Sequence, residues 1–191
     1  MNVAILGGTF NPPHYGHLFL ANEVRQKFFY DKIIFVPSYF SPHKSKDLNI
    51  SDYDRLNLLK LAIDKIHWAE FSDCDIVRGG VTRTIDTIRD IKKIYKLDNK
   101  PGFIIGDDLL DGFKNWKEPD QILIESDLIV GLRNNKKIKS KYNIKLVENK
   151  IFPLSSSEIR DRVSKSIDVD FLLPSKVIEY INEKNLYRYN S

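Results

Sequence analysis

The chain has 191 residues, a formal net charge of +4 at pH 7 and one cysteine. This length suits a single domain that buries its own core without disulfide bonds or structural metals. The lone Cys74 cannot form an internal disulfide, which indicates a reducing compartment. No stretch is long and apolar enough to cross a bilayer. We therefore expect a cytoplasmic protein with no membrane partner.

The basic charge raises the question of nucleic-acid binding. The densest basic run is Lys136-Lys137-Ile138-Lys139-Ser140-Lys141, and it contains no aromatic residue that could stack on bases. Such a run is typical of a solvated loop. A positive field also favours an enzyme that acts on small anionic substrates. Charge alone does not decide between these classes, and we expect no nucleic-acid partner.

Strand and helix patterns alternate along the chain. Apolar runs predict strands at residues 3–6, 32–37, 69–72, 101–106, 127–132 and 145–147. Between them, apolar spacing predicts a first helix that buries Leu18, Ala21, Val24 and Phe28. Ser51 then opens a helix with one apolar face, made of Leu56, Leu59, Ala62, Ile63 and Ile66. A helix over 84–95 carries Ile85, Ile88, Ile91 and Ile94, and further helices are expected through 122–123, after Ser155 and after Pro174.

Strands that are apolar throughout, with helices between them, are typical of an α/β protein. They predict a Rossmann-like doubly wound parallel sheet with helices on both faces and a small C-terminal helical segment. We expect one domain over 1–191, with 155–191 as its C-terminal helical part. Ligands in such folds bind beyond the carboxyl ends of the strands. Four segments that follow strands are therefore expected to meet: 7–8, 43–44, 106–108 and 155–160.

The sequence Gly7-Gly8-Thr9-Phe10-Asn11-Pro12-Pro13-His14-Tyr15-Gly16-His17 joins the first strand to the first helix. Glycines at such a turn let a ligand approach the backbone, and a helix N-terminus attracts phosphate. His14 and His17 share one side of the first helical turn, which favours a polyphosphate site. A metal-binding pair is the alternative, although no third ligand with familiar spacing lies nearby. A structural pair that satisfies loop carbonyls also stays open.

These residues resemble the G-G-x-F-D-P-x-H-x-G-H signature of the HxGH nucleotidyltransferase superfamily. Asn11 stands where that signature often has Asp. A second superfamily motif is similar to Ser155-Ser156-Ser157-Glu158-Ile159-Arg160. Two motifs so far apart in one chain make a more specific signal than either does alone.

Within the superfamily, almost the whole chain resembles the bacterial nicotinate-nucleotide adenylyltransferases. Four further segments carry this likeness: Ser41-Pro42-His43-Lys44, 82–87, 103–116 with Trp116 at its end, and 171–187. Two positions depart from the family pattern. Arg83 replaces an aromatic residue, and Asp107 replaces the usual Ala.

The resemblance implies a reaction and a set of site residues. The expected reaction is adenylyl transfer from ATP to nicotinate mononucleotide, which gives deamido-NAD and pyrophosphate in NAD biosynthesis, with Mg²⁺ accompanying ATP and no metal held by the protein itself. Catalytic roles fall to His14, His17, Lys44 and Arg160. ATP binding falls to Gly7, Gly8, Thr9, Phe10, His14, His17, Gly106, Asp108, Arg133, Ser155, Ser156, Ser157 and Arg160. Binding of nicotinate mononucleotide falls to Lys44, Arg83, Thr84, Asp108 and Trp116.

Each of these roles has a structural alternative. Lys44 could be solvated, and Arg160 could pair with Glu158 or Asp161. Residues 155–157 could act only as a helix cap, as could Thr84 and Asp108, and Trp116 could belong to the core.

Alternatives also remain at the level of function. Transfer to nicotinamide mononucleotide, or to both mononucleotides, differs from the expected reaction by one functional group of the acceptor. A nucleotide-binding regulator without turnover is an alternative of another class. A homo-oligomer is left open.

Overall fold

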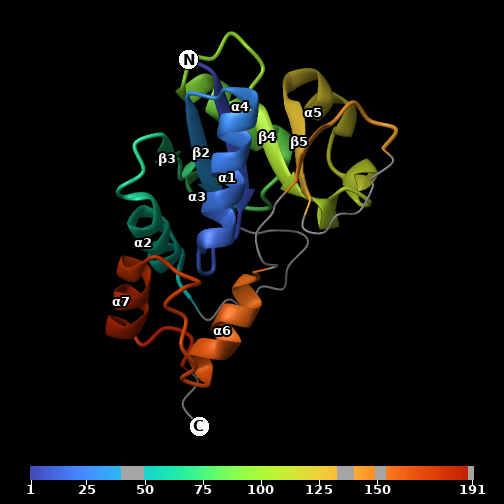
Figure 1. Ribbon diagram of the computed structural model, residues 1–191. Helices are drawn as coiled ribbons and strands as arrows, with labels where there is room; N and C mark the ends of the chain where they lie inside the picture. The colour runs from blue at the N-terminus through green and yellow to red at the C-terminus, as the bar shows by residue number, and fades with distance from the viewer. Residues whose placement is uncertain (40–49, 133–139, 149–153, 189–191) are drawn as a thin grey trace.

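Six parallel strands form the central sheet of the protein (Figure 1). The computed structural model describes residues 1–39, 50–132, 140–148 and 154–188. The strands are β1 (Val3–Gly8), β2 (Lys32–Pro37), β3 (Ala69–Phe71), β4 (Gly102–Gly106), β5 (Asp127–Leu132) and β6 (Lys145–Glu148). Their order is β3-β2-β1-β4-β5-β6, and every neighbouring pair is parallel. This is the expected doubly wound sheet, and its strand order reverses between β1 and β4.

Helices connect the strands and continue the chain after β6. The longer ones are α1 (Tyr15–Phe28), α2 (Asp52–Ile63), α4 (Thr84–Ile94), α6 (Ser156–Ser164) and α7 (Ser175–Glu183). Shorter ones are α3 (Cys74–Arg78), α5 (Pro119–Glu125) and the 3₁₀ turns η1 (Asp107–Leu109) and η2 (Phe113–Asn115). In the described residues, no helix has the length and apolar character that a membrane crossing requires.

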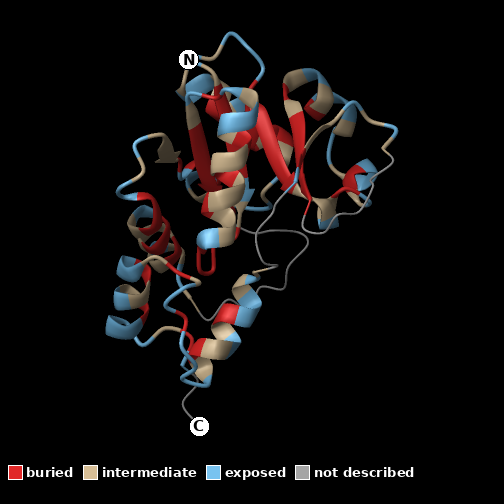
Figure 2. Ribbon diagram, viewed as in Figure 1, coloured by how far each residue is buried: buried red, intermediate tan, exposed pale blue. Residues whose placement is uncertain are grey.

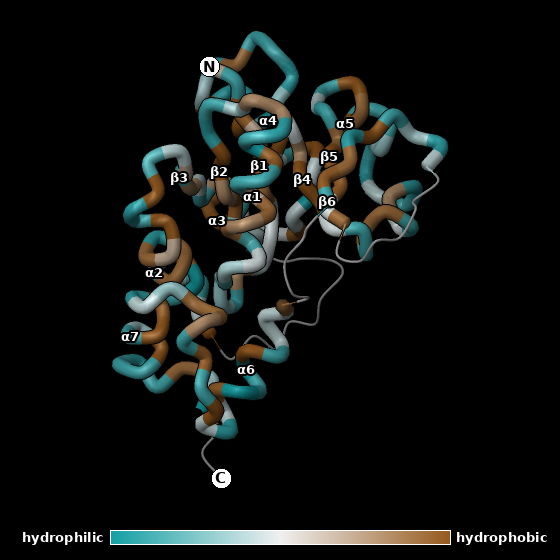
Figure 3. The backbone as a smooth tube through the Cα atoms, viewed as in Figure 1, coloured by the Kyte–Doolittle hydropathy of each residue, from teal (hydrophilic) through white to brown (hydrophobic). Residues whose placement is uncertain are grey.

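The two faces of the sheet bury two separate hydrophobic clusters. Successive side chains of β1 alternate between them, because neighbouring residues of a strand point to opposite faces. Ala4 and Leu6 pack with residues of α1, α2, α6 and α7, whereas Val3 and Ile5 pack with residues of α3, α4 and α5. Figure 2 shows the central strands as buried and Figure 3 shows them as hydrophobic. Helices therefore cover both faces, as the apolar strands predicted.

Local patterns predicted several elements closely. The strands at 32–37 and 127–132 have the expected bounds, and the strand expected at 101–106 begins one residue later, at Gly102. Ser51 caps α2, because its Oγ accepts a hydrogen bond from the backbone N–H of Asp54 at 3.0 Å. Ser155 caps α6 in the same way, with the N–H of Glu158 at 3.1 Å. Pro174 lies at the N-cap of α7, one position before the first turn where we expected it.

The helices differ from the sequence patterns at three points. The buried face of α2 includes Leu58 and Arg55 in place of Leu56, and α2 ends before Ile66. Ile94 is 55% exposed at the end of α4, because an exact three-residue spacing drifts around a helix with 3.6 residues per turn. Helix α3 was not expected, since five residues are too few to show a period.

Candidate active site

The chain leaves β1 through a loop that folds over a buried aromatic ring. Gly7 is exposed although β1 lies in the middle of the sheet, so its backbone is accessible at the carboxyl end of the strand. Phe10 is 1% exposed and has a left-handed φ of 49°. A side chain at Gly8 would place its Cβ 3.1 Å from the ring of Phe10. Glycine at position 8 therefore allows the ring to pack beneath the loop.

The two histidines form one unit at the start of α1. His14 is the N-cap residue, and the centre of its ring lies 3.7 Å from that of His17. The backbone N–H of His14 donates to Nδ1 of His17 at 3.2 Å. A neutral imidazole that accepts at Nδ1 carries its proton on Nε2. Nε2 of His17 is thus a hydrogen-bond donor, which is the role that a phosphate oxygen requires.

Gly16 is necessary for this arrangement. A Cβ at position 16 would lie 3.0 Å from both Cε1 and Nδ1 of His14. That distance is well below ordinary carbon contacts. Residue 16 therefore has to be glycine if the His14 ring is to lie against the first turn of α1 without shifting.

Donors from remote parts of the chain hold the loop in place. The guanidinium of Arg55 is fully buried and donates to the carbonyl of Thr9 at 3.0 Å. Nη1 of Arg160 donates to the carbonyl of Asn11 at 2.8 Å, and Oγ of Ser156 donates to that of Pro12 at 2.9 Å. These bonds direct carbonyl oxygens of the loop toward protein donors. An anion at the loop is therefore less exposed to the negative ends of those carbonyl dipoles.

The side chain of Asn11 has a buried partner of its own. The hydroxyl of Tyr187, which is 5% exposed, donates to Oδ1 of Asn11 at 2.7 Å. Burial raises the pKa of this phenol, so Tyr187 stays protonated and keeps its donor across the neutral range. The C-terminal segment therefore anchors the loop between β1 and α1.

The second motif, residues 155–160, contacts the loop of the first motif through the hydrogen bonds of Ser156 and Arg160. In the part of the chain that the structure describes, Arg160 does not pair with the two neighbouring acids considered above. Glu158 pairs with Arg162, and Asp161 pairs with Lys165. Nη2 of Arg160 donates instead to Oγ of Ser157 at 3.1 Å, which leaves the hydroxyl hydrogen of Ser157 for another acceptor. A guanidinium carries five N–H donors, so these contacts leave some for a phosphate group.

A second group of expected site residues lies near the start of α4. Thr84 is the first residue of α4, and Arg83, which is exposed, occupies the N-cap position, so Thr84 is not the cap. Trp116 follows η2 as its C-cap residue. The centre of its ring lies 5.3 Å from that of Phe113, and the side chain is partly buried against the core. Nζ of Lys117 lies 3.2 Å from a carboxylate oxygen of Asp86. The segments of Trp116 and Thr84 are thereby joined.

The end of β4 contributes the remaining described positions. Gly106 closes β4 beside β1 and is the N-cap of η1. Asp108 lies inside η1 and is exposed, so it is not an N-cap residue. Two expected site residues, Lys44 and Arg133, lie outside the described residues.

Sequence reasoning did not single out Arg55 or Tyr187 as site residues. Arg55 was hidden because a charged residue on a buried helix face leaves no apolar signal. Its burial depends on two partners, Asp52 and the carbonyl of Thr9. Tyr187 appeared only within the C-terminal resemblance, since nothing in its local sequence indicates a partner 176 positions away.

A second polar cluster lies between α3 and α4. Cys74, Asp75 and Asp90 bring three potential metal-ligand atoms within 4.8 Å of one another. Arg78 pairs with both carboxylates, and Thr87 donates to Asp75 at 2.7 Å. Burial is the main cause that raises the pKa of Asp75. The cation between these two acids is therefore the guanidinium of Arg78.

A parallel α/β sheet, a histidine pair at a helix start and an arginine held against the same loop together define a nucleotidyltransferase. The sequence profile of the cytidylyltransferase-like family matches residues 5–162. A probable nicotinate-nucleotide adenylyltransferase of Borreliella burgdorferi is 45% identical over 98% of this chain and 97% of its own length. One of Bacillus licheniformis is 36% identical over 97% of both chains. The chain therefore belongs to the nicotinate-nucleotide adenylyltransferase family.

Solved structures agree with this fold. A Plasmodium falciparum nicotinic acid mononucleotide adenylyltransferase complexed with APC superposes with a TM-score of 0.78 at 22% identity, and the match covers 99% of this chain and 98% of that one. The same enzyme complexed with NaAD gives a TM-score of 0.76 at 24% identity. At these identities the likeness concerns the fold, and it extends over 99% of this chain.

Proposed function

We propose that this enzyme transfers the adenylyl group of ATP to nicotinate mononucleotide, giving deamido-NAD and pyrophosphate as a step of NAD biosynthesis. The observation that carries the proposal is the contact of Arg160 and Ser156 with the carbonyls of Asn11 and Pro12. It supports a single triphosphate site made from the two motifs. The relatives named above support the choice of acceptor.

The chemistry in this proposal is a direct displacement. A phosphate oxygen of the mononucleotide attacks the α-phosphorus of ATP, the new P–O bond forms, and the bond to pyrophosphate breaks. The protein needs no nucleophile of its own, because its work is to position two anions and to stabilise the charge that grows on the transferred and leaving groups.

Individual residues receive roles from the chemistry of their groups. His17 donates from Nε2 to the α-phosphate region, and His14 supports the neighbouring phosphates. Arg160 binds the leaving pyrophosphate with donors that the loop does not use. Backbone N–H groups after Ser155, together with Ser157, bind phosphate oxygens at the start of α6. Ser156 acts by holding the loop, since its hydroxyl hydrogen already serves Pro12.

The loop residues and the end of β4 complete the proposed ATP site. Gly7, Gly8, Thr9 and Phe10 give the nucleotide access to the backbone, while Gly106 and Asp108 face its ribose. Lys44 and Arg133, which lie outside the described residues, are proposed to add positive charge. At the acceptor side, Thr84 and Arg83 bind the nicotinate carboxylate and Trp116 stacks on its ring.

Imidazole, guanidinium and serine groups suit phosphate oxygens, whereas Mg²⁺ prefers oxygen ligands such as phosphate, carboxylate and water. We therefore propose that Mg²⁺ arrives bound to ATP as part of the substrate. The proposed partners are small molecules, so the reaction requires neither nucleic acid nor a membrane. A buried cysteine without a disulfide fits the cytoplasm as its compartment. We also propose that the chain is one domain, with 155–191 as its C-terminal helical part.

Pyrophosphate release tests the function. The protein is mixed with ATP, Mg²⁺ and either nicotinate or nicotinamide mononucleotide, and kcat/KM is measured for each. We expect release with the acid and much slower release with the amide. Release with neither acceptor would refute the proposal, and a preference for the amide would overturn the choice of acceptor alone.

A further inference from the structure

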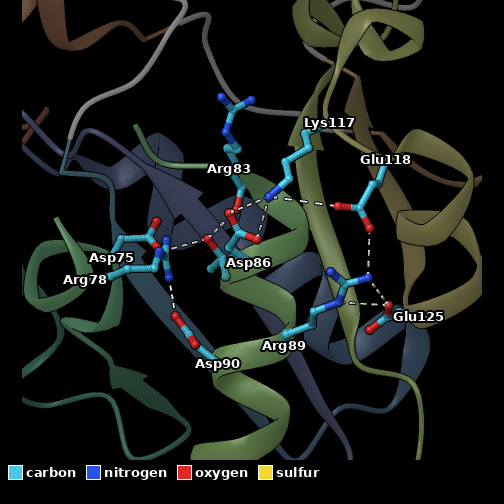
Figure 4. A network of polar contacts seen from close by, with 10 residues as sticks. Asp75, Arg78, Arg83, Asp86, Arg89, Asp90, Lys117, Glu118 and Glu125 are labelled. Carbon is cyan, nitrogen blue, oxygen red and sulfur yellow. Dashed lines mark hydrogen bonds and ion pairs between the residues drawn. The ribbon is translucent and has the colours of Figure 1, made fainter. Parts of the chain in front are cut away.

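A network of charged side chains connects α4 with the segment that carries Trp116. It consists of Asp86, Arg89, Lys117, Glu118 and Glu125, and we call it the α4–α5 charge network (Figure 4). Nζ of Lys117 lies 3.2 Å from Asp86 and 3.9 Å from Glu118. Arg89 donates to Glu118 at 3.0 Å and to Glu125 at 2.8 Å. Two cations thus alternate with three acids.

The backbone between η2 and α5 needs such support. Glu118 has φ 52° and ψ 54°, a left-handed conformation that is unfavourable for any residue with a side chain. This residue turns the chain from the extended Trp116 into α5, which begins at Pro119. The ion pair of Glu118 with Arg89 holds its carboxylate against α4. The network therefore fixes a turn that local preference alone would not choose.

The other side of α4 is held independently. Thr87 donates to the buried carboxylate of Asp75 at 2.7 Å, and Arg78 pairs with both Asp75 and Asp90. These contacts fix α4 to α3. The ion pair of Lys117 with Asp86 therefore attaches the loop that carries Lys117 to a helix that is held in place by other contacts. Lys117 follows Trp116 directly, and Asp86 lies two residues after Thr84.

We propose that the α4–α5 charge network positions Trp116 against the first turn of α4 and thereby sets the affinity of the enzyme for its mononucleotide acceptor. This inference rests on the proposed function, because it takes Trp116 and Thr84 as acceptor-binding residues. Lys117 and Asp86 are positioning residues, which act through Trp116 without touching the reacting atoms.

Two variants separate positioning from simple attraction. Lys117→Met removes a positive charge, and both explanations predict a higher KM for the anionic acceptor. Asp86→Asn removes a negative charge, so attraction alone predicts a lower KM, whereas loss of positioning predicts a higher one. We expect each variant to raise the acceptor KM by about two- to fivefold, within the range of an exposed ion pair, with the KM for ATP and kcat little changed. The double variant should cost no more than the larger single effect.

A matched control removes a comparable ion pair elsewhere. Lys145 pairs with Asp127 at 2.7 Å, and the two side chains are 42% and 40% exposed, against 40% and 27% for Lys117 and Asp86. Lys145→Met should leave the acceptor KM unchanged. Unchanged KM values in Lys117→Met, or a lowered KM in Asp86→Asn, would overturn the inference.

A readout without substrate completes the test. The chain has two tryptophans, so Trp68→Phe leaves Trp116 as the only one. In that background, we expect Lys117→Met to increase the quenching of Trp116 fluorescence by acrylamide, and Lys145→Met to leave it unchanged. Equal quenching in all three proteins would overturn the inference. Absence of pyrophosphate release by the unaltered enzyme would refute the proposed function instead, so the two failures are distinguishable.

Discussion

Replacement of Gly16 by alanine should separate activity from stability. The new Cβ would lie 3.0 Å from Cε1 and Nδ1 of His14. Carbon atoms pack best at about 3.5–4.0 Å, so the ring has to shift by about 0.5 Å. The His14 side chain is 5% exposed and its ring lies 3.7 Å from that of His17. The shift therefore disturbs both histidines.

For folding, a stabilising and a destabilising effect of the new methyl group oppose each other, whereas for catalysis the effect is only a loss. Alanine stabilises a helix by about 0.5–1 kcal/mol relative to glycine, which offsets part of the steric cost. A misplacement of about 1 Å can cost roughly 10²-fold in rate, so about half that displacement should cost about tenfold in kcat/KM. We expect Gly16→Ala to lose about tenfold in kcat/KM while its free energy of unfolding changes by less than ~1 kcal/mol.

Pyrophosphate release and urea unfolding measure the two quantities. Gly112→Ala is the matched control, since its Cβ would meet nothing closer than the carbonyl of Leu109 at 3.8 Å. In a His14→Ala background the steric conflict is absent, so Gly16→Ala should there stabilise the protein by the full ~0.5–1 kcal/mol. Wild-type kcat/KM for Gly16→Ala in the otherwise unaltered enzyme would refute the reasoning.

Three further predictions concern the same loop and the buried phenols. His17→Ala should lower kcat by at least about 10²-fold with little loss of stability, because it removes a donor to the transferred group; surviving activity would contradict the role of His17. Tyr187→Phe leaves Oδ1 of Asn11 without its donor, so the free energy of unfolding in urea should fall by about 1–3 kcal/mol and the KM for ATP should rise; two unchanged values would contradict the anchor. Burial raises the pKa of Tyr30 and Tyr95 to about 12 from 10, so the folded state keeps protons that the unfolded chain loses, and stability should fall as pH rises from 10 to 12. Urea unfolding across that range checks the sign, and constant stability would contradict it.

Local sequence predicted a strand or a helix cap correctly where the residues that specify it are neighbours in one segment. The run Lys32–Pro37 is apolar and closed by proline, and the structure has a strand with those bounds. Ser51 and Ser155 precede helical patterns, and both cap helices, because a serine Oγ reaches an N–H only three residues ahead. Helix α2 shows the limit. Which of its sides is buried depends on the elements that it meets, and Arg55 is buried there through its contacts with Thr9 and Asp52.

The sequence by itself determined the alternation of strands and helices, the glycine and histidine loop, and the kind of chemistry that those side chains offer. Only the tertiary structure decided which distant groups complete the loop. Arg160 and Tyr187 reach Asn11 from 149 and 176 positions away. Patterns of 2 or 3.6 residues describe a segment and its own neighbours. Contacts across the chain depend on the order of the strands, and that order exists only when the sheet has formed.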